Sequence, residues 1–402
     1  MSKKGKGEYS LTDNLTPLQL ISLDACTRCN ECLNWCTVLE VTEDLSLTPP
    51  EKIRIFGEMI RARHGLLSRV LGPRPLKPES LEKLSEALYT CTTCGRCGEV
   101  CEVGILTQRL WPTLRAKMVE LGVGPMEPQR GAPATVEAKH NPYDRPHENR
   151  FAWLPEDIPI AEESEVGYFA GCSGPYTAQA MNIGAVRIIA ATGTKFTINM
   201  DEWCCGFPLW VLGYQDMLQD LALHNIEAYS QRGVKQLLVS CPCCTDHLAH
   251  RWPQLYGKRL PFEIVHITQF AAQKIETGEL RFTKPFPRTM TFHDPCYLSR
   301  AMKIFDEPRR VIAQFPEVNF LEMEQNRELS KCCGAGGGTR RAFTQMTLDL
   351  ATNMIHEVEQ MGAEVLAVTC PACYERFHLV QEQGLETNLE VKDLMELASE
   401  LL

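Results

Sequence analysis

Short apolar runs alternate with longer amphipathic stretches in the C-terminal part of the chain. The run Val166–Phe169 is followed by a pattern of helical period over Ala178–Ala191 and later by a second apolar run, Leu237–Val239. This alternation predicts strand–helix units with parallel strands, an α/β architecture. Cysteines such as Cys172 and Cys241 follow the runs, so we expect them beyond the carboxyl ends of the strands, where open α/β sheets bind ligands.

The same pattern occurs twice. The blocks VGYFAGC, EWCCG and LLVSCPCC of the first copy correspond to MTFHDPC, SKCCG and LAVTCPAC of the second, and the corresponding cysteines are 124 to 129 positions apart. Such self-similarity predicts a duplicated domain. We place the two copies at residues 166–285 and 286–402.

Residues 21–120 contain two groups of cysteines separated by amphipathic, helix-like sequence. Lys52–Leu71 is predicted to form one helix. Its apolar face would carry Ile53, Phe56, Ile60, Leu67 and Leu71, and its other face Arg54, Arg61, Arg63 and Arg69. The basic face either docks a partner or an anionic membrane surface, or is an ordinary solvated helix face.

Two segments lack such periodicity. Residues 1–20 are expected to form a polar tail. Residues 121–165 contain seven prolines, and we interpret them as a linker between the helical module and the duplicated domains.

Composition narrows the class of protein. The chain has 402 residues and a formal net charge of −10, which argues against a nucleic-acid partner because nucleic acids attract basic surfaces. No stretch approaches the roughly 18 apolar residues of a membrane-spanning helix, and no secretory signal is evident. We therefore expect a cytoplasmic protein, in which clustered cysteines indicate metal binding or catalysis rather than disulfides.

Eighteen of the 19 cysteines fall into four motifs, two of which share the spacing C-x2-C-x2-C-x3-C. These two consist of Cys26, Cys29, Cys32 and Cys36, and of Cys91, Cys94, Cys97 and Cys101. In ferredoxins with two 4Fe–4S clusters, the fourth cysteine of such a motif binds the other cluster. We therefore predict that Cys101 completes the first set and Cys36 the second. Zinc sites, the alternative, use other spacings.

The other two motifs have five cysteines each, in the order C–CCG–C-P-x-C. They consist of Cys172, Cys204, Cys205, Cys241 and Cys244, and of Cys296, Cys332, Cys333, Cys370 and Cys373. Five thiols exceed what one tetrahedral metal or one cubane cluster uses. The adjacent pair therefore suggests a bridging thiolate or a cluster of unusual nuclearity. Cys243 is an additional thiol in the first C-P-x-C, either a spare buried cysteine or a site of redox reactivity.

These motifs resemble the paired cysteine-rich (CCG) domains of heterodisulfide reductases. Their order resembles the D subunit of the membrane-bound enzyme, over roughly residues 21–400. The resemblance implies an α+β/α/β fold: a mostly helical ferredoxin module with two cubane 4Fe–4S clusters (residues 21–120), followed by two duplicated α/β CCG domains. It also implies a noncubane 4Fe–4S cluster on each five-cysteine set, with no flavin or NAD in this chain.

The resemblance further implies an oxidoreductase that cleaves or forms a disulfide-like sulfur bond in one-electron steps. The implied partners are a cytochrome b-type, quinone-reactive membrane subunit, other redox subunits, and a small sulfur substrate or a sulfur-carrier protein. The chain would then lie peripherally on the cytoplasmic face of the inner membrane. The same domain order occurs in electron-relay subunits of glycolate oxidase and anaerobic glycerol-3-phosphate dehydrogenase, which is the alternative function.

Residues near the second five-cysteine set suggest that the C-terminal copy carries the chemistry, with Cys296, Cys332, Cys333, Cys370 and Cys373 as its catalytic cysteines. His293 either donates a proton to a leaving thiolate or only holds the loop. Arg340 and Arg341 either bind an anionic substrate or are solvated. Gly334 and Gly337 lie in a glycine run that would leave space beside the cluster, whereas the matching Phe207–Trp210 is bulky. The substrate and the direction of electron flow stay open.

Overall fold

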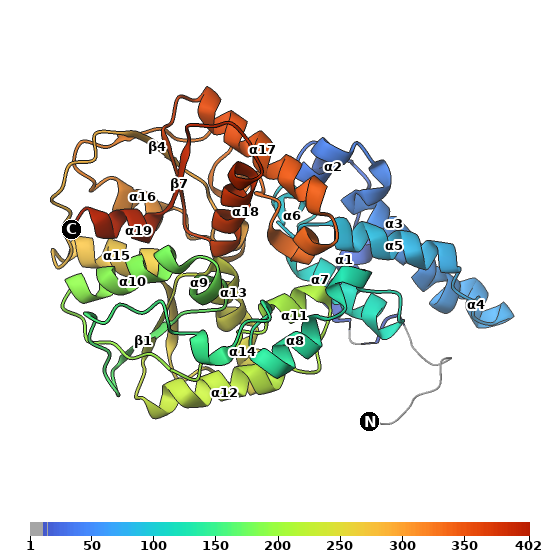
Figure 1. The fold of residues 1–402 in the computed structure, drawn as a ribbon. Helices are drawn as coiled ribbons and strands as arrows, with labels where there is room; N and C mark the ends of the chain where they lie inside the picture. Colours follow the sequence, from blue (N-terminus) through green and yellow to red (C-terminus); the bar gives the residue numbers. More distant parts are fainter. Residues whose placement is uncertain (1–10, 14) are drawn as a thin grey trace. The chain divides into compact units, whose positions relative to one another are not determined.

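The computed structural model describes residues 11–13 and 15–402, and it divides into two compact units (Figure 1). The expected tail, residues 1–20, falls partly outside the described residues, and the first helix begins within it at Pro17. Unit 1 comprises Met1–Arg130, Leu209–Gln215 and Gly336–Thr347, and unit 2 comprises Gly131–Pro208, Asp216–Ala335 and Leu348–Leu402.

Unit 1 is helical, as the amphipathic pattern predicts. Its helices are α1 (Pro17–Asp24), α2 (Thr37–Thr42), α3 (Pro49–His64), α4 (Leu66–Leu71), α5 (Pro78–Thr90), α6 (Arg96–Glu99) and α7 (Thr107–Glu120). Proline opens α1, α3 and α5, at the position where its missing N–H costs nothing. Thr16 additionally caps α1 by accepting a hydrogen bond from the Gln19 amide (3.2 Å).

The prediction of one helix over Lys52–Leu71 is wrong in two respects. The helix ends at His64, and Gly65 adopts an extended conformation before the short α4 begins. Ile53 and Phe56 are buried as expected, but Leu67 and Leu71 are exposed. The break at Gly65 turns the second half of the predicted apolar face toward solvent, because glycine is a poor helix former.

Each duplicated domain contributes one segment to unit 1. The buried guanidinium of Arg115 on α7 joins them, since it donates to the carbonyl oxygens of Val211 and Gly337 (2.7 Å each). It also donates to the carbonyl oxygens of Leu88 (2.7 Å) and Cys91 (2.6 Å). One side chain on α7 therefore binds the end of α5 and the two segments from the duplicated domains.

Unit 2 contains two parallel sheets, which confirms the α/β prediction. Strands β1 (Val166–Phe169), β2 (Gln236–Val239) and β3 (Glu263–His266) form the first sheet in the order β1-β2-β3. Strands β4 (Thr289–Phe292), β5 (Asn319–Phe320), β6 (Val365–Val368) and β7 (Glu390–Asp393) form the second in the order β5-β4-β6-β7. Most strand residues are buried, as is typical of parallel sheets covered on both faces.

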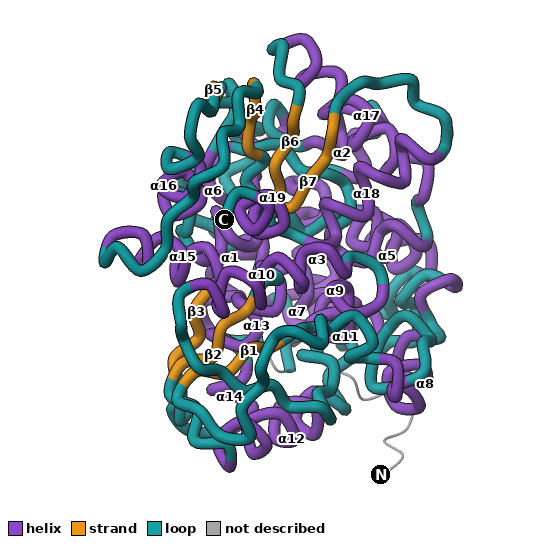
Figure 2. The backbone as a smooth tube through the Cα atoms, turned by 60° about the vertical axis from the view of Figure 1, so that its left-hand side comes forward, coloured by secondary structure: helices purple, strands orange, loops and turns teal. Residues whose placement is uncertain are grey.

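Helices cover and connect the two sheets of unit 2 (Figure 2). They are α8 (Ala132–Lys139), α9 (Ser173–Tyr176), α10 (Gln179–Ala191), α12 (Leu218–Gln231), α13 (Pro242–His250), α14 (Trp252–Tyr256), α15 (Ile267–Glu276), α16 (Asp306–Ile312), α18 (Pro371–Glu382) and α19 (Leu394–Glu400). Two more helices, α11 (Phe207–Leu212) and α17 (Thr344–Gln360), have residues in both units.

The two copies within unit 2 pack together in a reciprocal way. Helix α10 of the first copy contacts α19 of the second, and α15 of the first contacts α16 of the second. Helices α10 and α16 follow equivalent strands, as do α15 and α19, so the interface resembles that of a twofold-symmetric dimer. A Cβ on Gly184 would lie 2.4 Å from the backbone nitrogen of Glu396, so α10 and α19 touch through backbone. The copies share one hydrophobic core.

Part of the proline-containing segment 121–165, interpreted above as a linker, packs into unit 2. Its part in unit 2 includes α8 and buries the side chains of Arg150 and Trp153. Trp153 belongs to the core that the two sheets share.

Candidate metal centres

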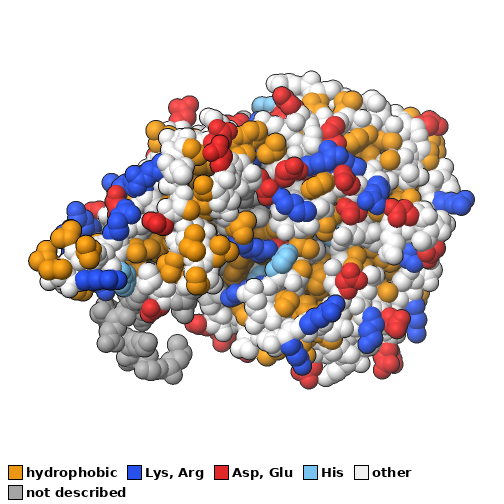
Figure 3. All heavy atoms as spheres, turned by 180° about the vertical axis from the view of Figure 1, so that it is seen from behind, with side chains coloured by type: hydrophobic (Ala, Val, Ile, Leu, Met, Phe, Trp, Pro, Cys, Tyr) orange, Lys and Arg blue, Asp and Glu red, His pale blue; other side chains and the backbone are white. Residues whose placement is uncertain are grey.

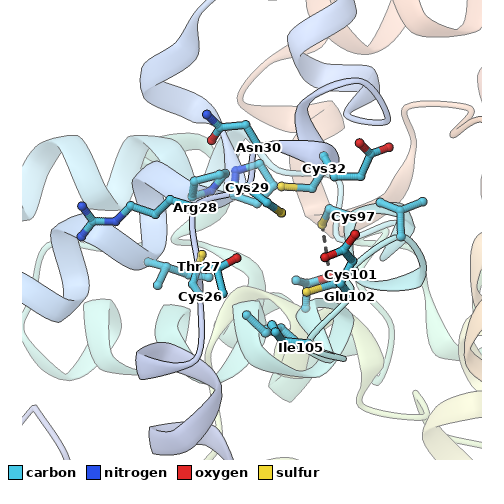
Figure 4. Close-up of a pocket in the computed structure, with 17 residues that line it drawn as sticks. Cys26, Thr27, Arg28, Cys29, Asn30, Cys32, Cys97, Cys101, Glu102 and Ile105 are labelled. Atoms are coloured by element: carbon cyan, nitrogen blue, oxygen red, sulfur yellow. Dashed lines mark hydrogen bonds between the residues drawn. The ribbon is translucent and has the colours of Figure 1, made fainter.

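The first pocket of unit 1 gathers the thiols of one predicted cluster. Cys26, Cys29, Cys32 and Cys101 line a hollow of about 480 Å³, part of it open to solvent, and Figure 4 shows their sulfur atoms around it. Burial raises the pKa of the Cys32 thiol to about 11, and the neighbouring thiolates of Cys26, Cys29 and Cys101 contribute to this rise. Arg28 and Asn30 have positive φ angles, which lets the short loop present its cysteines to one side.

A second pocket of unit 1 is lined by Cys36, Cys91, Cys94 and Cys97. Burial raises the pKa of Cys97, and so do the thiolates of Cys94, Cys91 and Cys36. The backbone amide of Thr93 donates to Cys91 Sγ at 3.4 Å. Cys101 thus lies with the first motif and Cys36 with the second, which is the crossed arrangement that the spacing predicts, and Cys97 lines both pockets.

Lys52 and Arg115 are buried cations beside the second pocket, and the sequence analysis missed both. Lys52 is almost fully buried on α3, donates to the Leu47 carbonyl oxygen, and lowers the pKa of Cys36, which burial raises. Arg115 is fully buried and donates to the carbonyl oxygen of Cys91. Positive charge here favours thiolates and an anionic cluster. No local signal marks either residue, because charges on amphipathic helices normally face solvent.

The strands of unit 2 place the first five-cysteine set at one sheet edge. Cys172 lies three residues after β1 and directly before α9, and Cys241 lies two residues after β2 and directly before α13. Cys205 Sγ lies 3.3 Å from Cys244 Sγ, and the nearby Cys204 thiol, together with burial, raises the pKa of Cys172. Amides of the CCG loop point at this set: Gly206 donates to Cys204 Sγ at 3.4 Å.

A buried ion pair supports the loop before Cys172. Glu202 and Arg150 are both fully buried, with 3.1 Å between Oε1 and Nη2. Arg150 Nη2 also lies 3.7 Å from Cys172 Sγ. Glu202 accepts hydrogen bonds from the amides of residues 170 and 171 and from the Tyr229 hydroxyl, each at 2.9 Å. The sequence analysis did not identify this pair, although an acid two residues before a buried cysteine pair is a usable signal.

In the second set, the structure adds a histidine to the thiols. Cys333 Sγ lies 3.0 Å from Cys373 Sγ, which lies 3.5 Å from His293 Nε2. The three donor atoms all lie within 4.8 Å of one another and are buried. His293 Nδ1 is also buried and has no hydrogen-bond partner among the described residues. The first copy has Phe169 three residues before its first cysteine, so this feature is particular to the second copy.

Cys243 connects the two sets. It is half-buried, and its thiol lies so close to Cys241 of its own copy and to Cys370 of the other that both raise its pKa. Cys370 in turn contacts Cys373, and Cys332 contacts Cys333. The additional thiol therefore lies at the junction of the copies, which the sequence repeat alone did not indicate.

The remaining predicted site residues are placed as follows. Cys296 begins the π-helical turn Tyr297–Ala301 shortly after β4. Gly334 donates its amide to Cys332 Sγ at 3.3 Å. The open space expected at Gly337 is absent: this residue belongs to unit 1, and a Cβ on it would lie 2.5 Å from the Cys91 carbonyl oxygen. Arg340 and Arg341 also belong to unit 1, Arg340 half-buried and Arg341 exposed.

The donor sets fit iron–sulfur clusters better than protonated thiols or disulfides. All 19 cysteines are free, and those of each pocket raise one another's pKa. Coordinated iron removes this penalty because it stabilises the thiolates that ligate it.

Comparison with protein families defines the class. A model described as "4Fe-4S dicluster domain" matches residues 22–105, and one described as "Cysteine-rich domain" matches residues 166–249 and 290–378. The chain is therefore an iron–sulfur protein with a dicluster module and a duplicated cysteine-rich domain.

Curated relatives define the family. The chain is 36% identical to the D subunit of the dihydromethanophenazine:CoB–CoM heterodisulfide reductase of Methanosarcina barkeri, over 97% of both chains. It is 25% identical to the B subunit of the fumarate reductase (CoM/CoB) of Methanothermobacter marburgensis, over 93% of this chain and 71% of that one. It is 28% identical to the EtfAB:quinone oxidoreductase of Syntrophomonas wolfei, over 79% and 48%. The chain belongs to the family of heterodisulfide reductase D subunits.

These findings confirm the predicted fold layout, the iron–sulfur electron-transfer role and the oxidoreductase class. Among the described residues, no helix is both long enough and apolar enough to cross a bilayer.

Proposed function

We propose that this chain is the subunit of a redox complex that reduces or oxidises a disulfide-like sulfur substrate, and that the C-terminal copy carries this reaction. The observation that carries the proposal is the buried group formed by His293, Cys333 and Cys373, which combines cluster-type thiols with a side chain able to donate a hydrogen bond. The name of the Methanosarcina relative, which acts on the CoB–CoM heterodisulfide, supports this substrate class.

Four clusters would be held by the 18 motif cysteines. Cys26, Cys29, Cys32 and Cys101 would hold one cubane 4Fe–4S cluster, and Cys36, Cys91, Cys94 and Cys97 the other. Each five-cysteine set would hold one noncubane cluster. Bound clusters supply one-electron redox chemistry. Anaerobically reconstituted protein should then contain ~16 irons per chain, and stoichiometric zinc, or iron for two cubanes only, would contradict the assignment.

Reduction of the substrate breaks one S–S bond, consumes two electrons and two protons, and yields two thiols. The electrons would come from a reduced quinone-type carrier through a cytochrome b-type membrane subunit, and oxidation would return them by the same route. In its protonated form His293 would donate Nε2–H to the Cys373 thiolate and Nδ1–H to the substrate sulfur on which negative charge develops. The partner subunit would hold the chain at the cytoplasmic face of the membrane.

The test compares two variants at His293. With a reduced viologen dye and the CoB–CoM heterodisulfide as probe, His293→Ala should lower turnover about 100-fold, the usual cost of losing a donor to developing charge. His293→Asn, which keeps an N–H near Nδ1, should retain more activity. Both should keep full iron content. The control His378→Ala changes a half-buried histidine on α18 whose ring contacts Tyr374 edge to face, and it should be near normal.

Normal turnover of His293→Ala at full iron content would refute the role of His293. The second candidate function is electron relay for a flavoprotein, which the resemblance to the EtfAB:quinone oxidoreductase favours. If no disulfide or sulfur carrier turns over while a reduced flavoprotein reduces the clusters rapidly, this candidate replaces the first.

A further inference from the structure

Helix α4 of unit 1 turns its apolar side chains outward. Leu66, Leu67, Val70 and Leu71 are 80%, 61%, 78% and 72% exposed. At about 3.6 residues per turn, these four positions share one face of the helix. Ser68, by contrast, is buried and donates to the Gly65 carbonyl oxygen at 2.6 Å. This polarity is the reverse of that of a helix packed on a protein core.

The exposed face is part of an ordered structure. The Gly65 amide donates to the Arg61 carbonyl oxygen (3.0 Å), and the Arg74 amide donates to the Ala62 carbonyl oxygen (3.0 Å), so the chain after α4 returns to the end of α3. Figure 1 shows α4 at the far end of α3. The structure therefore presents the apolar face on a fixed projection of unit 1.

The surroundings of this face are strongly basic. Residues 59–78 contain four arginines and one lysine but no aspartate or glutamate, although the whole chain has a net charge of −10. The basic residues are Arg61, Arg63, Arg69, Arg74 and Lys77. Figure 3 shows hydrophobic side chains at its left edge, where α4 lies in this view, with basic side chains beside them. Four adjacent apolar side chains with basic residues before, between and after them in the chain fit the boundary between anionic headgroups and acyl chains.

We propose that α4 inserts its apolar face into the cytoplasmic leaflet of an anionic membrane, with the surrounding arginines and Lys77 on the lipid headgroups. This inference deepens the membrane localisation proposed above, because it assigns lipid contact to this chain itself. Neither the apolar nor the basic part suffices alone, since stable attachment of a peripheral protein takes two signals. Binding should therefore be reversible and should weaken with salt.

The experiment uses the cluster-loaded protein and protein-free vesicles, so its outcome does not depend on the redox activity. Flotation with vesicles of phosphatidylcholine and phosphatidylglycerol should recover the protein, and pure phosphatidylcholine should recover much less. Leu66→Ser/Val70→Ser/Leu71→Ser should lower the partition constant by about tenfold or more per side chain, because burying each such side chain is worth that much. Arg69→Gln/Arg74→Gln should lower it about fivefold per charge.

The matched control is Leu18→Ser/Ile21→Ser/Leu45→Ser, three side chains of unit 1 that are 62%, 62% and 63% exposed. It should bind within twofold of the wild type. Brominated lipid should quench the fluorescence that the new tryptophan adds in Leu67→Trp. The fluorescence that the new tryptophan adds in Leu45→Trp should not be quenched.

Absence of binding to anionic vesicles, or an equal loss in the control variant, would overturn the proposal. Light scattering without lipid measures self-association. If the wild type is a dimer and the triple α4 variant is a monomer, the apolar face binds a second copy of the chain and not a membrane. Cross-linking of α4 to a membrane subunit, without vesicle binding, would assign the face to a protein partner. In neither case would the proposed redox reaction be affected.

Discussion

Replacing Glu202 by glutamine tests the buried support of the first five-cysteine set. The carboxylate accepts four hydrogen bonds, two at each oxygen, from Arg150, Tyr229 and two backbone amides. Glutamine accepts at one oxygen only and turns an NH2 group toward the other donors. Arg150 also loses its buried partner, and breaking such a pair typically costs 3–5 kcal/mol.

Part of this loss is offset. Burial raises the pKa of the Glu202 carboxyl, so the charged form pays a desolvation penalty that glutamine does not. We therefore expect the lower end of the range, about 3 kcal/mol. In a unit of this size that lowers the melting temperature by roughly 10 °C. Because Glu202 holds the amides before Cys172, iron bound to this set should also fall.

The assay is anaerobic thermal unfolding followed by circular dichroism, together with iron quantitation. Glu227→Gln is the control, since Glu227 is exposed on α12 and its replacement should cost less than about 0.5 kcal/mol. If Glu202→Gln melts within 2 °C of the wild type (~0.5 kcal/mol) with full iron, the pair does not support this loop and the reasoning fails.

Three further changes test other parts of the structure. Gly337→Ala places a Cβ 2.5 Å from the Cys91 carbonyl oxygen at a φ of +65°, so it should destabilise unit 1 by more than about 2 kcal/mol. Its control is Gly122→Ala, which also has a positive φ but lies in open space and should cost about 1 kcal/mol. Urea unfolding of both variants measures the difference. Cys243→Ser should leave the iron content unchanged, because the motif around it is complete without it, and a loss as large as that of Cys244→Ser would make it a ligand. Burial raises the pKa of Asp393 from 3.8 to about 7, so between these values the native state keeps a proton that the unfolded state releases, and stability falls as pH rises. Asp393→Asn keeps the hydrogen bond that caps α19. The free energy of unfolding of this variant, relative to that of the wild type, should therefore rise by about 1 kcal/mol between about pH 6 and about pH 8. If the difference between the two proteins does not change with pH, the carboxyl does not titrate in this range.

The sequence by itself determined the chemistry of this protein. Iron–sulfur ligation requires thiols at short, characteristic spacings, so the motif around Cys26 and its repeat were recognisable without a structure. The duplication and its α/β character followed from recurring apolar runs that end in cysteine, because buried parallel strands need continuous apolar sequence. The family resemblance rested on the same local patterns.

Only the tertiary structure decided which distant residues meet. The inclusion of Gly337 in unit 1, against the Cys91 backbone, depends on where the chain crosses between units, and no local pattern encodes that. Lys52 is buried on α3 next to the predicted apolar face, and Leu71 is exposed because the break at Gly65 separates α4 from that face. Cys243 reached Cys370 because the two copies pack reciprocally. Local spacing specifies which groups can bind iron, whereas side-chain burial and contacts between copies arise from packing over the whole chain.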